Sequence, residues 1–437
     1  MKVEIFSKNR KMFWLLFLYG VMALAYSYLM PPWEGPDEPA HYGISYNLAI
    51  GAEYPTLDVN YEAHQPQLYY RMGAKILDRM STSERAMYRP EAIETNIRHP
   101  KAVYQWTNEN YRFLLGLYVL RWINILFGGV ALALNYFAVL RLTRGNEQVA
   151  LATLAFMALI PQYLHTSSSV ANDALGALAG AFAFWLFARY LTGGMRRVEY
   201  TLAVFLAFVM PFVTKLTAFP AGIAIVFGFL VGGRQWQGRR WGRYLIGAVL
   251  VAGIFLGLLW LLSPDEAILY FRTLYWRAFY INEEARSITY LWAQLMQIVR
   301  SFWGFMGWLS VPLPDWVTLL LTILALLGSG VTVWSVFAQE RAHAIPDRLH
   351  RGLVVLIALV SVGAVLKTAT VTVNSQGRFL FPALGVLGIV ILGGWFTLLA
   401  SKFHKHILLF VIIGMLCVNL ILWIWGIIPV FYQPVLG

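Results

Sequence analysis

The sequence predicts an all-α integral membrane protein with about eleven transmembrane helices and a large first outer loop. Of its 437 residues, 59% are hydrophobic and only 13% are charged, whereas about a quarter of a soluble domain is charged. The mean hydropathy is +0.60. Apolar runs of about 20 residues, the length that crosses a bilayer, recur along the whole chain. Basic residues gather in the short connectors between alternate runs.

The expected spans follow one another from end to end, so residues 1–437 are treated as a single polytopic membrane domain. The first run is long enough to span and lacks the small-residue cleavage site of a signal peptide, so we expect it to remain as a helix. The eleven runs are residues 12–30, 113–140, 148–164, 171–190, 199–213, 217–232, 244–262, 316–338, 352–371, 379–400 and 406–429.

The basic connectors predict the orientation. Lys and Arg residues precede the first span, which places the N-terminus in the cytoplasm by the positive-inside rule. Alternation then puts every other short basic connector on the same side and the C-terminus on the outer side. The residues concerned are Lys2, Lys8, Arg10, Lys11, Arg141, Arg144, Arg189, Arg196, Arg197, Arg234, Arg239, Arg240, Arg243, Arg341, Arg348, Arg351, Lys402 and Lys405.

Two long polar segments fall on the predicted outer side, residues 31–112 and residues 263–315. The outer turns at residues 165–169, 214–215 and 372–378 are polar as well, whereas the inner connectors are short and basic. We therefore expect function to lie at the outer face. Within the first outer loop, the mixed polar and aromatic stretches near residues 37–49 and 67–77 predict helices that lie along the membrane interface.

Composition also excludes several classes of function. The net charge of +12 is explained by the basic inner connectors and by anionic lipid, and no nucleic-acid reading motif accompanies it. No GxxxxGK loop is present for nucleotide hydrolysis. Cys417 is the single cysteine, which rules out an intrachain disulfide and a thiolate metal site. The absence of repeated broken helices weighs against a transporter.

The strongest catalytic candidates lie in PPWEGPDEPAHY, residues 31–42, directly after the first span. Asp37 and Glu38 are flanked by prolines that suit the start of a helix. A carboxylate there can take a proton from a substrate hydroxyl as a general base. The alternative is that Asp37 only caps the following helix. The clustering of acids and His41 at the mouth of a span favours catalysis, with Asp37 first and Glu38 second.

The same loop carries EAHQPQLYY, residues 62–70. His64 and Gln65 offer hydrogen bonds to a substrate, and Tyr69 offers a ring face on which a sugar can stack. His41 and His64 together with an acid would suit a divalent metal. Two histidines without close spacing are weak support for a metal, so we expect no cofactor, and a divalent metal stays the less favoured alternative.

A second acid follows the hydroxyl-rich stretch at residues 167–169. Asn172 and Asp173 stand where the fourth span begins, and an ionisable group there indicates function. Helix capping is the competing interpretation. In the functional interpretation Asp173 orients a catalytic group or binds the acceptor hydroxyl, and Asn172 contributes to substrate binding.

Two cations complete the candidate site. Lys215 lies between two apolar segments with no carboxylate nearby in sequence, which favours phosphate binding over a snorkelling lysine. Arg378 opens a predicted outer helix in the stretch NSQGRFLFP, residues 374–382, with Gln376 just before it. A guanidinium beside a helix N-terminus suits a phosphate. The alternative for Arg378 is an ion pair with Asp37 or Asp173.

Together these residues resemble a known superfamily. An acid pair after the first span, a large first outer loop and many further spans resemble the GT-C polyprenyl-linked glycosyltransferases. Five blocks in combination resemble the uncharacterised bacterial membrane proteins of domain-of-unknown-function family 2142. These blocks are PDEPAHY (36–42), EAHQPQLYY (62–70), SSSVANDAL (167–175), SFWGFMGW (301–308) and QGRFLFP (376–382).

The resemblance implies sugar transfer at the outer face of a bacterial cytoplasmic membrane. A GT-C base maps onto Asp37 and a second acid onto Asp173, and the donor is a polyprenyl-phosphate-linked sugar. A glycan, a lipid or a protein remains open as the acceptor, although the chain lacks the large soluble C-terminal domain of the oligosaccharyltransferases. The alternatives are a transporter or flippase of lipid-linked sugars and a non-catalytic component of envelope polysaccharide assembly.

Overall fold

The computed structural model describes residues 9–80, 108–193, 195–231, 241–338, 343–372 and 375–432. Regular structure in these ranges is helical apart from one short antiparallel ribbon, β1 (Phe305–Met306) and β2 (Val311–Pro312). The predicted all-α class is therefore confirmed. The helices are α2 (Arg10–Leu29), α3 (Glu38–Ala49), η1 (Tyr61–His64), α4 (Leu68–Asp78), α6 (Asn108–Leu142), α7 (Glu147–Ala158), α8 (Pro161–Ser167), α9 (Asp173–Leu191), α10 (Arg197–Val213), η2 (Leu216–Ala218), α11 (Phe219–Val231), α12 (Trp241–Leu262), α13 (Pro264–Phe279), η4 (Glu283–Arg286), α14 (Ile288–Trp303), α15 (Asp315–Phe337), α16 (Arg348–Thr368), η5 (Gly377–Ala383), α17 (Leu384–Leu398), η6 (Ser401–Phe403), α18 (His404–Leu422), η7 (Trp423–Ile427) and α19 (Ile428–Tyr432).

Each predicted span corresponds to a helix or a bent helix pair, but the count of eleven spans is not confirmed. Among the described residues, seven helices are long and apolar enough to cross a membrane, or eight if the bent pair α7 and α8 is one span. The predicted spans at 199–213 and 217–232 form shorter apolar helices, Glu199–Val213 and Leu216–Val231.

The predicted span at 148–164 is broken. Helices α7 and α8 meet at an angle of 65°. Pro161 is the first residue of α8. Proline has no N–H to continue a helical ladder, and it drives the residue before it out of the helical region. Ile160 accordingly has extended backbone angles. The break sends the chain toward the polar turn that precedes α9.

Small residues bring α9 close to the segment that carries Arg378. A Cβ added to Gly180 of α9 would collide with the backbone carbonyl of Pro382 in η5. Glycine at such a crossing lets two backbones approach closely within a membrane protein. Because α9 begins at Asp173 and η5 begins at Gly377, this contact fixes the two predicted site segments relative to each other.

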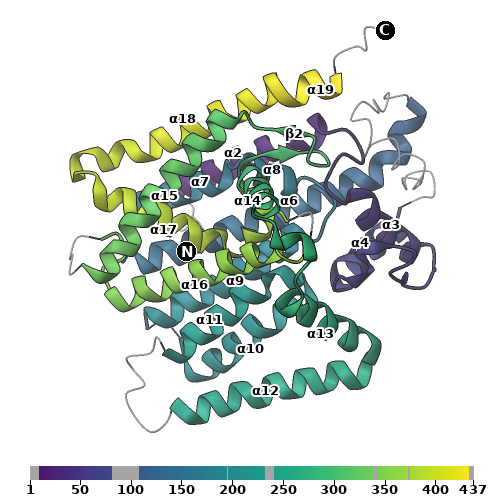
Figure 1. The fold of residues 1–437 in the computed structure, drawn as a ribbon, viewed down its shortest axis with the longest axis horizontal. Coiled ribbons are helices and arrows are strands. Elements are labelled where there is room, and N and C mark those ends of the chain that lie inside the picture. Colours follow the sequence, from purple (N-terminus) through teal and green to yellow (C-terminus); the bar gives the residue numbers. More distant parts are fainter. Residues whose placement is uncertain are drawn as a thin grey trace.

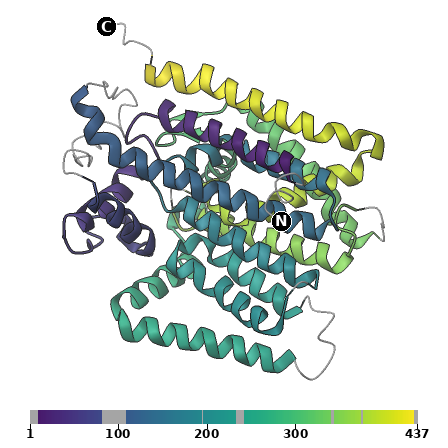
Figure 2. The ribbon, with the colours of Figure 1, turned by 180° about the vertical axis from the view of Figure 1, so that it is seen from behind.

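The described part of the predicted first outer loop, residues 31–80, forms a compact unit at one end of the helical bundle. Helices α3 and α4 pack together there, and η1 contacts α13 from the second predicted outer segment. Figures 1 and 2 show α3, α4 and α13 at the same end of the molecule from opposite sides. The stretches predicted to form helices near residues 37–49 and 67–77 are α3 and α4, so this part of the prediction is confirmed.

A buried ion pair ties that loop to the bundle. Arg121 of α6 donates to both carboxylate oxygens of Glu38, over 2.8 and 2.6 Å. The same carboxylate accepts the backbone N–H groups of Trp33 and Val170. Arg121 and Glu38 are both fully buried. Because the backbone amides supply the remaining hydrogen bonds, the charges are satisfied away from water. Glu38 therefore fixes the start of α3, one residue after Asp37.

Candidate active site

Asp37 occupies the position before α3, but its side chain does not cap the helix. Its backbone lies in the left-handed region with φ of 59°, which is uncommon for a residue other than glycine. The carboxylate instead contacts the Arg378 guanidinium at 2.5 Å and accepts the Tyr61 hydroxyl at 3.1 Å. The structure thus rejects the capping interpretation and directs this carboxylate into a polar cluster.

Arg378 links Asp37 to the second predicted acid. One guanidinium nitrogen contacts Asp37, and the other lies 3.6 Å from the carboxylate of Asp173. The Lys215 amine lies 2.8 Å from the same carboxylate. Residues from the first outer loop, α9, the turn before η2 and η5 therefore meet at one place. Two acids and two cations that sequence analysis selected separately lie within one network.

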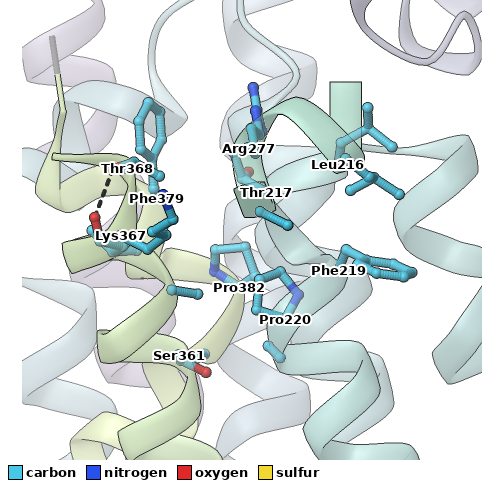
Figure 3. Close-up of a pocket in the computed structure, with 16 residues that line it drawn as sticks. Leu216, Thr217, Phe219, Pro220, Arg277, Ser361, Lys367, Thr368, Phe379 and Pro382 are labelled. Carbon is cyan, nitrogen blue, oxygen red and sulfur yellow. Dashed lines mark hydrogen bonds between the residues drawn. The ribbon is translucent and has the colours of Figure 1, made fainter. Parts of the chain in front are cut away.

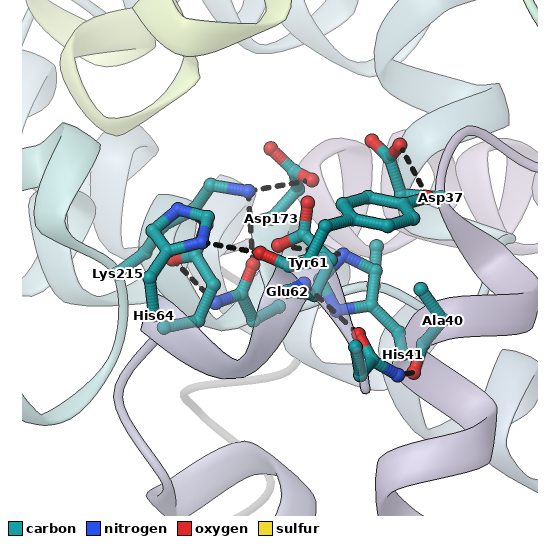
Figure 4. A network of polar contacts seen from close by, with 12 residues as sticks. Asp37, Ala40, His41, Tyr61, Glu62, His64, Asp173 and Lys215 are labelled. Carbon is teal, nitrogen blue, oxygen red and sulfur yellow. Dashed lines mark hydrogen bonds and ion pairs between the residues drawn. The ribbon is translucent and has the colours of Figure 1, made fainter. Parts of the chain in front are cut away.

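Amide side chains extend this network back to the first loop. Asn172 does not cap α9. It accepts from the Lys215 amine at 2.9 Å and donates to Gln65 at 3.2 Å. Gln65 contacts Nε2 of His64, whose Nδ1 contacts the Tyr61 carbonyl. Figure 4 shows Tyr61, His64, Asp173 and Lys215 around this network. The hydrogen bonds hold the loop and the start of α9 in a fixed arrangement.

Charge and burial set the protonation of the loop residues. Burial opposes the ionisation of Asp37 most strongly, but Arg378, His41 and Tyr61 together outweigh burial and hold the pKa of this carboxyl below its usual value. Asp37 is therefore a carboxylate at neutral pH. Burial lowers the pKa of His64 to about 4, so that ring is neutral and serves as a hydrogen-bonding group. Burial likewise lowers the pKa of His41 and raises that of Glu62.

His41 and Glu62 lie beside the ion pairs. Nε2 of His41 is 3.9 Å from a carboxylate oxygen of Glu62, and Nδ1 of His41 contacts the Tyr70 hydroxyl at 2.8 Å. Asp37, His41 and Glu62 offer ligand atoms that all lie within 4.8 Å of one another. These three residues are the group that could hold a metal ion in the described part of the chain.

Three other predicted residues lie differently. Glu38 belongs to the buried pair with Arg121 rather than to the Asp37 network. Tyr69 is buried and accepts a hydrogen bond from Asn124, so its ring offers no open face for a sugar in this conformation. Gln376 precedes η5, and its buried amide oxygen accepts no hydrogen bond from the described residues.

Sequence analysis overlooked Tyr61, Glu62 and Arg121 as contributors. Arg121 had a usable signal, because a charged residue inside an apolar span requires a buried partner. Glu62 begins a block that was selected for its histidine, amide and tyrosines. Tyr61 had no signal in sequence, since its hydroxyl matters only through its contact with Asp37.

An apolar pocket opens beside the two cations. It has a volume of about 220 Å³ and is lined by residues of η2, α11, α13, α16 and η5, including Leu216, Phe219, Phe379 and Pro382. Arg277 and Lys367 are the charged residues in this lining. Figure 3 shows Arg277 beside Thr217 and Phe379, with Pro382 and Pro220 below them. Leu216 and Phe379 directly follow Lys215 and Arg378, so the pocket adjoins the network.

Comparison with known proteins supports one class of activity. Residues 114–261, about a third of the chain, match the family of dolichyl-phosphate-mannose-protein mannosyltransferases. The matched region contains Asn172, Asp173 and Lys215 but neither Asp37 nor Arg378. No curated protein sequence matches the chain. The family match supports a membrane-bound glycosyltransferase of the GT-C type, and it does not bear on the resemblance to family 2142.

Proposed function

We propose that this protein is a GT-C-type membrane glycosyltransferase that moves a sugar from a polyprenyl-phosphate donor to an acceptor. The observation that carries the proposal is the bridge that Arg378 makes between Asp37 and Asp173, beside Lys215. A carboxylate and preformed cations in one buried network are what such a transfer needs. The match to a mannosyltransferase family supports the same class.

In the proposed reaction Asp37 is the general base. Its carboxylate accepts the proton of an acceptor hydroxyl while that oxygen attacks the anomeric carbon of the sugar. The bond between the anomeric carbon and the phosphate oxygen breaks on the opposite side, so the configuration inverts. Polyprenyl phosphate leaves with the bonding electrons, and Arg378 and Lys215 stabilise its charge.

In the proposed reaction Arg378 interacts first with the base and then with the leaving phosphate. Before the donor binds, Arg378 keeps Asp37 ionised through the contact at 2.5 Å. A donor phosphate competes for this guanidinium, because planar guanidinium groups bind phosphate through paired hydrogen bonds. Movement of Arg378 toward phosphate raises the pKa of the Asp37 carboxyl and makes it a better base. Asp173 holds Lys215 and Arg378 near the reacting atoms.

The pocket of Figure 3 gives the donor lipid a place to lie. Its lining is mainly apolar, and it adjoins the two cations through Leu216 and Phe379. An isoprenoid chain suits an apolar groove between helices, and Arg277 at the pocket adds positive charge for the phosphate. The sugar is then positioned by nearby polar groups, namely those of Asn172, Gln65, His64 and His41.

We place the reaction at the outer face of a bacterial cytoplasmic membrane, on the basis of the charge of the connectors. The acceptor is a glycan, a lipid or a protein of the cell envelope. The rival function is a flippase of lipid-linked sugars, which would need the same pocket and cations.

Release of polyprenyl phosphate separates these functions. Purified protein in proteoliposomes would be given a panel of polyprenyl-phosphate hexoses and pentoses together with envelope extract as acceptor. A transferase releases free polyprenyl phosphate and labels the acceptor with sugar. Movement of intact donor across the bilayer without release would reject the proposal in favour of a flippase. If neither release nor movement is observed, the result would support a non-catalytic role instead.

A further inference from the structure

Three residues of the first outer loop form a cluster that could bind a cation, and one of them, Asp37, is also the proposed base. Asp37 precedes α3, His41 lies one turn into α3, and Glu62 lies in η1. Their ligand atoms lie within 4.8 Å of one another. Ligands on one tetrahedral zinc ion at about 2.0–2.2 Å lie about 3.3–3.6 Å apart. Nε2 of His41 and Oε2 of Glu62 lie 3.9 Å apart, so small side-chain rotations would bring this pair onto one ion. Closure by up to about 1.5 Å would bring Asp37 to the same ion.

Glu62 supplies an independent indication of a cation site. The residue is 8% exposed, and its Oε2 is buried without a hydrogen-bond partner among the described residues. This oxygen is the one that faces Nε2 of His41 at 3.9 Å. A buried carboxylate oxygen without a partner is costly. Its position in the cluster directs it to the place where a cation would sit.

The neighbouring cations do not fill this need. Lys215 contacts Asp173 and Asn172, and Arg378 contacts Asp37 and Asp173. These two cations pair with Asp37 and Asp173. The Arg277 guanidinium interacts electrostatically with Glu62, but the described contacts include no ion pair between the two. A cation bound between Glu62 and Asp37 would contact both carboxylates directly.

His41 is held in the orientation that a metal ligand requires. Its ring stacks beside that of Tyr70 at an interplanar angle of 18°, and its Nδ1 contacts the Tyr70 hydroxyl at 2.8 Å. With the Nδ1 proton donated to that hydroxyl, Nε2 keeps its lone pair and faces Glu62. Histidine ligands are commonly fixed by a hydrogen bond to their second ring nitrogen.

We propose that Asp37, His41 and Glu62 bind one divalent cation. One imidazole and two carboxylates suit a first-row ion such as Mn²⁺ or Zn²⁺ better than Ca²⁺, which prefers six to eight oxygen ligands. This proposal replaces the expectation, drawn from sequence, that a divalent metal is the less favoured alternative. Three protein ligands leave coordination positions for substrate oxygens. The site stands on its own contacts, so it holds whether or not the transfer reaction does.

The test measures cation binding without donor or acceptor. Purified protein in detergent is stripped with a chelator and titrated with Mn²⁺, and free Mn²⁺ is followed by electron paramagnetic resonance. We expect one Mn²⁺ per chain, an affinity at least tenfold weaker in Glu62→Gln, and competition by Zn²⁺. Glu34→Gln is the matched control, because Glu34 is a buried acid of the same loop outside the cluster, and it should bind as the wild type does.

A second measurement distinguishes loss of a metal ligand from misfolding of the variant. Pulsed resonance of Mn²⁺ bound to the wild type should show the nitrogen coupling of one imidazole, and His41→Asn should remove it while His64→Asn retains it. Equal binding by wild type and Glu62→Gln with matching melting temperatures, or bound Mn²⁺ without nitrogen coupling, would overturn the site. Failure of sugar transfer with this binding intact would count against the proposed function alone.

Discussion

The Arg378 guanidinium lies 2.5 Å from the carboxylate of Asp37, although 341 residues separate them in sequence. The same guanidinium lies 3.6 Å from Asp173. The first outer loop is therefore joined to η5 and α9 through one side chain. In the proposed mechanism this contact keeps Asp37 ionised until the donor phosphate binds Arg378 in its place.

Replacement of Arg378 by alanine should lower kcat and raise KM for the polyprenyl-phosphate sugar. Loss of one preorganised charge in such a site costs about 10²–10³ in rate. Steady-state kinetics in proteoliposomes measure both constants. Arg378→Lys is the matched control, because it keeps the charge and loses the paired geometry, and it should fall between the wild type and alanine. Kinetics unchanged in the alanine variant would remove Arg378 from the mechanism.

The apolar pocket gives a separate prediction for donor binding. Arg277→Gln should weaken the binding of polyprenyl phosphate by about 10- to 100-fold, because a hydrogen bond to a charged group contributes about 1.5–3 kcal/mol. Arg272→Gln is the control, since Arg272 lies five residues away on α13 and lines a different cavity. Native mass spectrometry with polyprenyl phosphate compares the two variants. Equal weakening in both would point to general charge rather than to this pocket.

Glu38 and Arg121 should contribute to stability more than to chemistry. Glu38→Gln leaves a buried guanidinium without its counter-charge, and removal of one partner of such a pair costs about 3–5 kcal/mol. Denaturant unfolding in detergent measures the loss. Glu147→Gln is the matched control, because the pair of Glu147 with Lys11 is exposed at 3.8 Å and is worth less than about 1 kcal/mol. Similar losses in the two variants would contradict the anchoring role.

Glu34 predicts a dependence of stability on pH. Burial, with Glu38 nearby, raises the pKa of Glu34 to about 8 from an ordinary value of 4.5. The folded state therefore favours the protonated form, and the stability from Glu34 is complete below pH 4.5 and is lost as pH rises to 8. The slope is at most about 1.4 kcal/mol per pH unit. The melting temperature of the wild type should fall relative to that of Glu34→Gln as pH rises from about 5 to about 8, whereas a constant difference would exclude this titration.

Sequence analysis located the helices well because apolar runs and basic connectors are strong local signals. It was less successful with the number of spans. The lengths of the short apolar helices α10 and α11 depend on packing, and residues 148–164 were expected to form one continuous span although Pro161 breaks it. It selected Asp37, Asp173, Lys215 and Arg378 as ionisable residues at the predicted outer ends of the spans. The partners of those residues could not be read from sequence, because Arg378 meets Asp37 only through the tertiary fold. The close contact of Gly180 with Pro382 is a similar case.

The orientations of the side chains around Asp37 could not be predicted from the sequence either. The sequence suggested a helix cap at Asp37 as the competing role, and capping geometry depends on backbone angles that sequence does not specify. The left-handed backbone turns the carboxylate away from the helix. Conversely, the ring of Tyr69 was expected to face a sugar, but the packing of α4 against α3 buries it.

The role of Asp37 as the general base is tested most directly by measuring sugar transfer by Asp37→Asn in proteoliposomes. The substitution preserves shape and removes the base, and general-base catalysis contributes about 10²–10⁴ in rate. We expect release of polyprenyl phosphate to fall by that factor, while the melting temperature and the binding of polyprenyl phosphate are retained. Transfer within twofold of wild type in this variant would contradict Asp37 as the base.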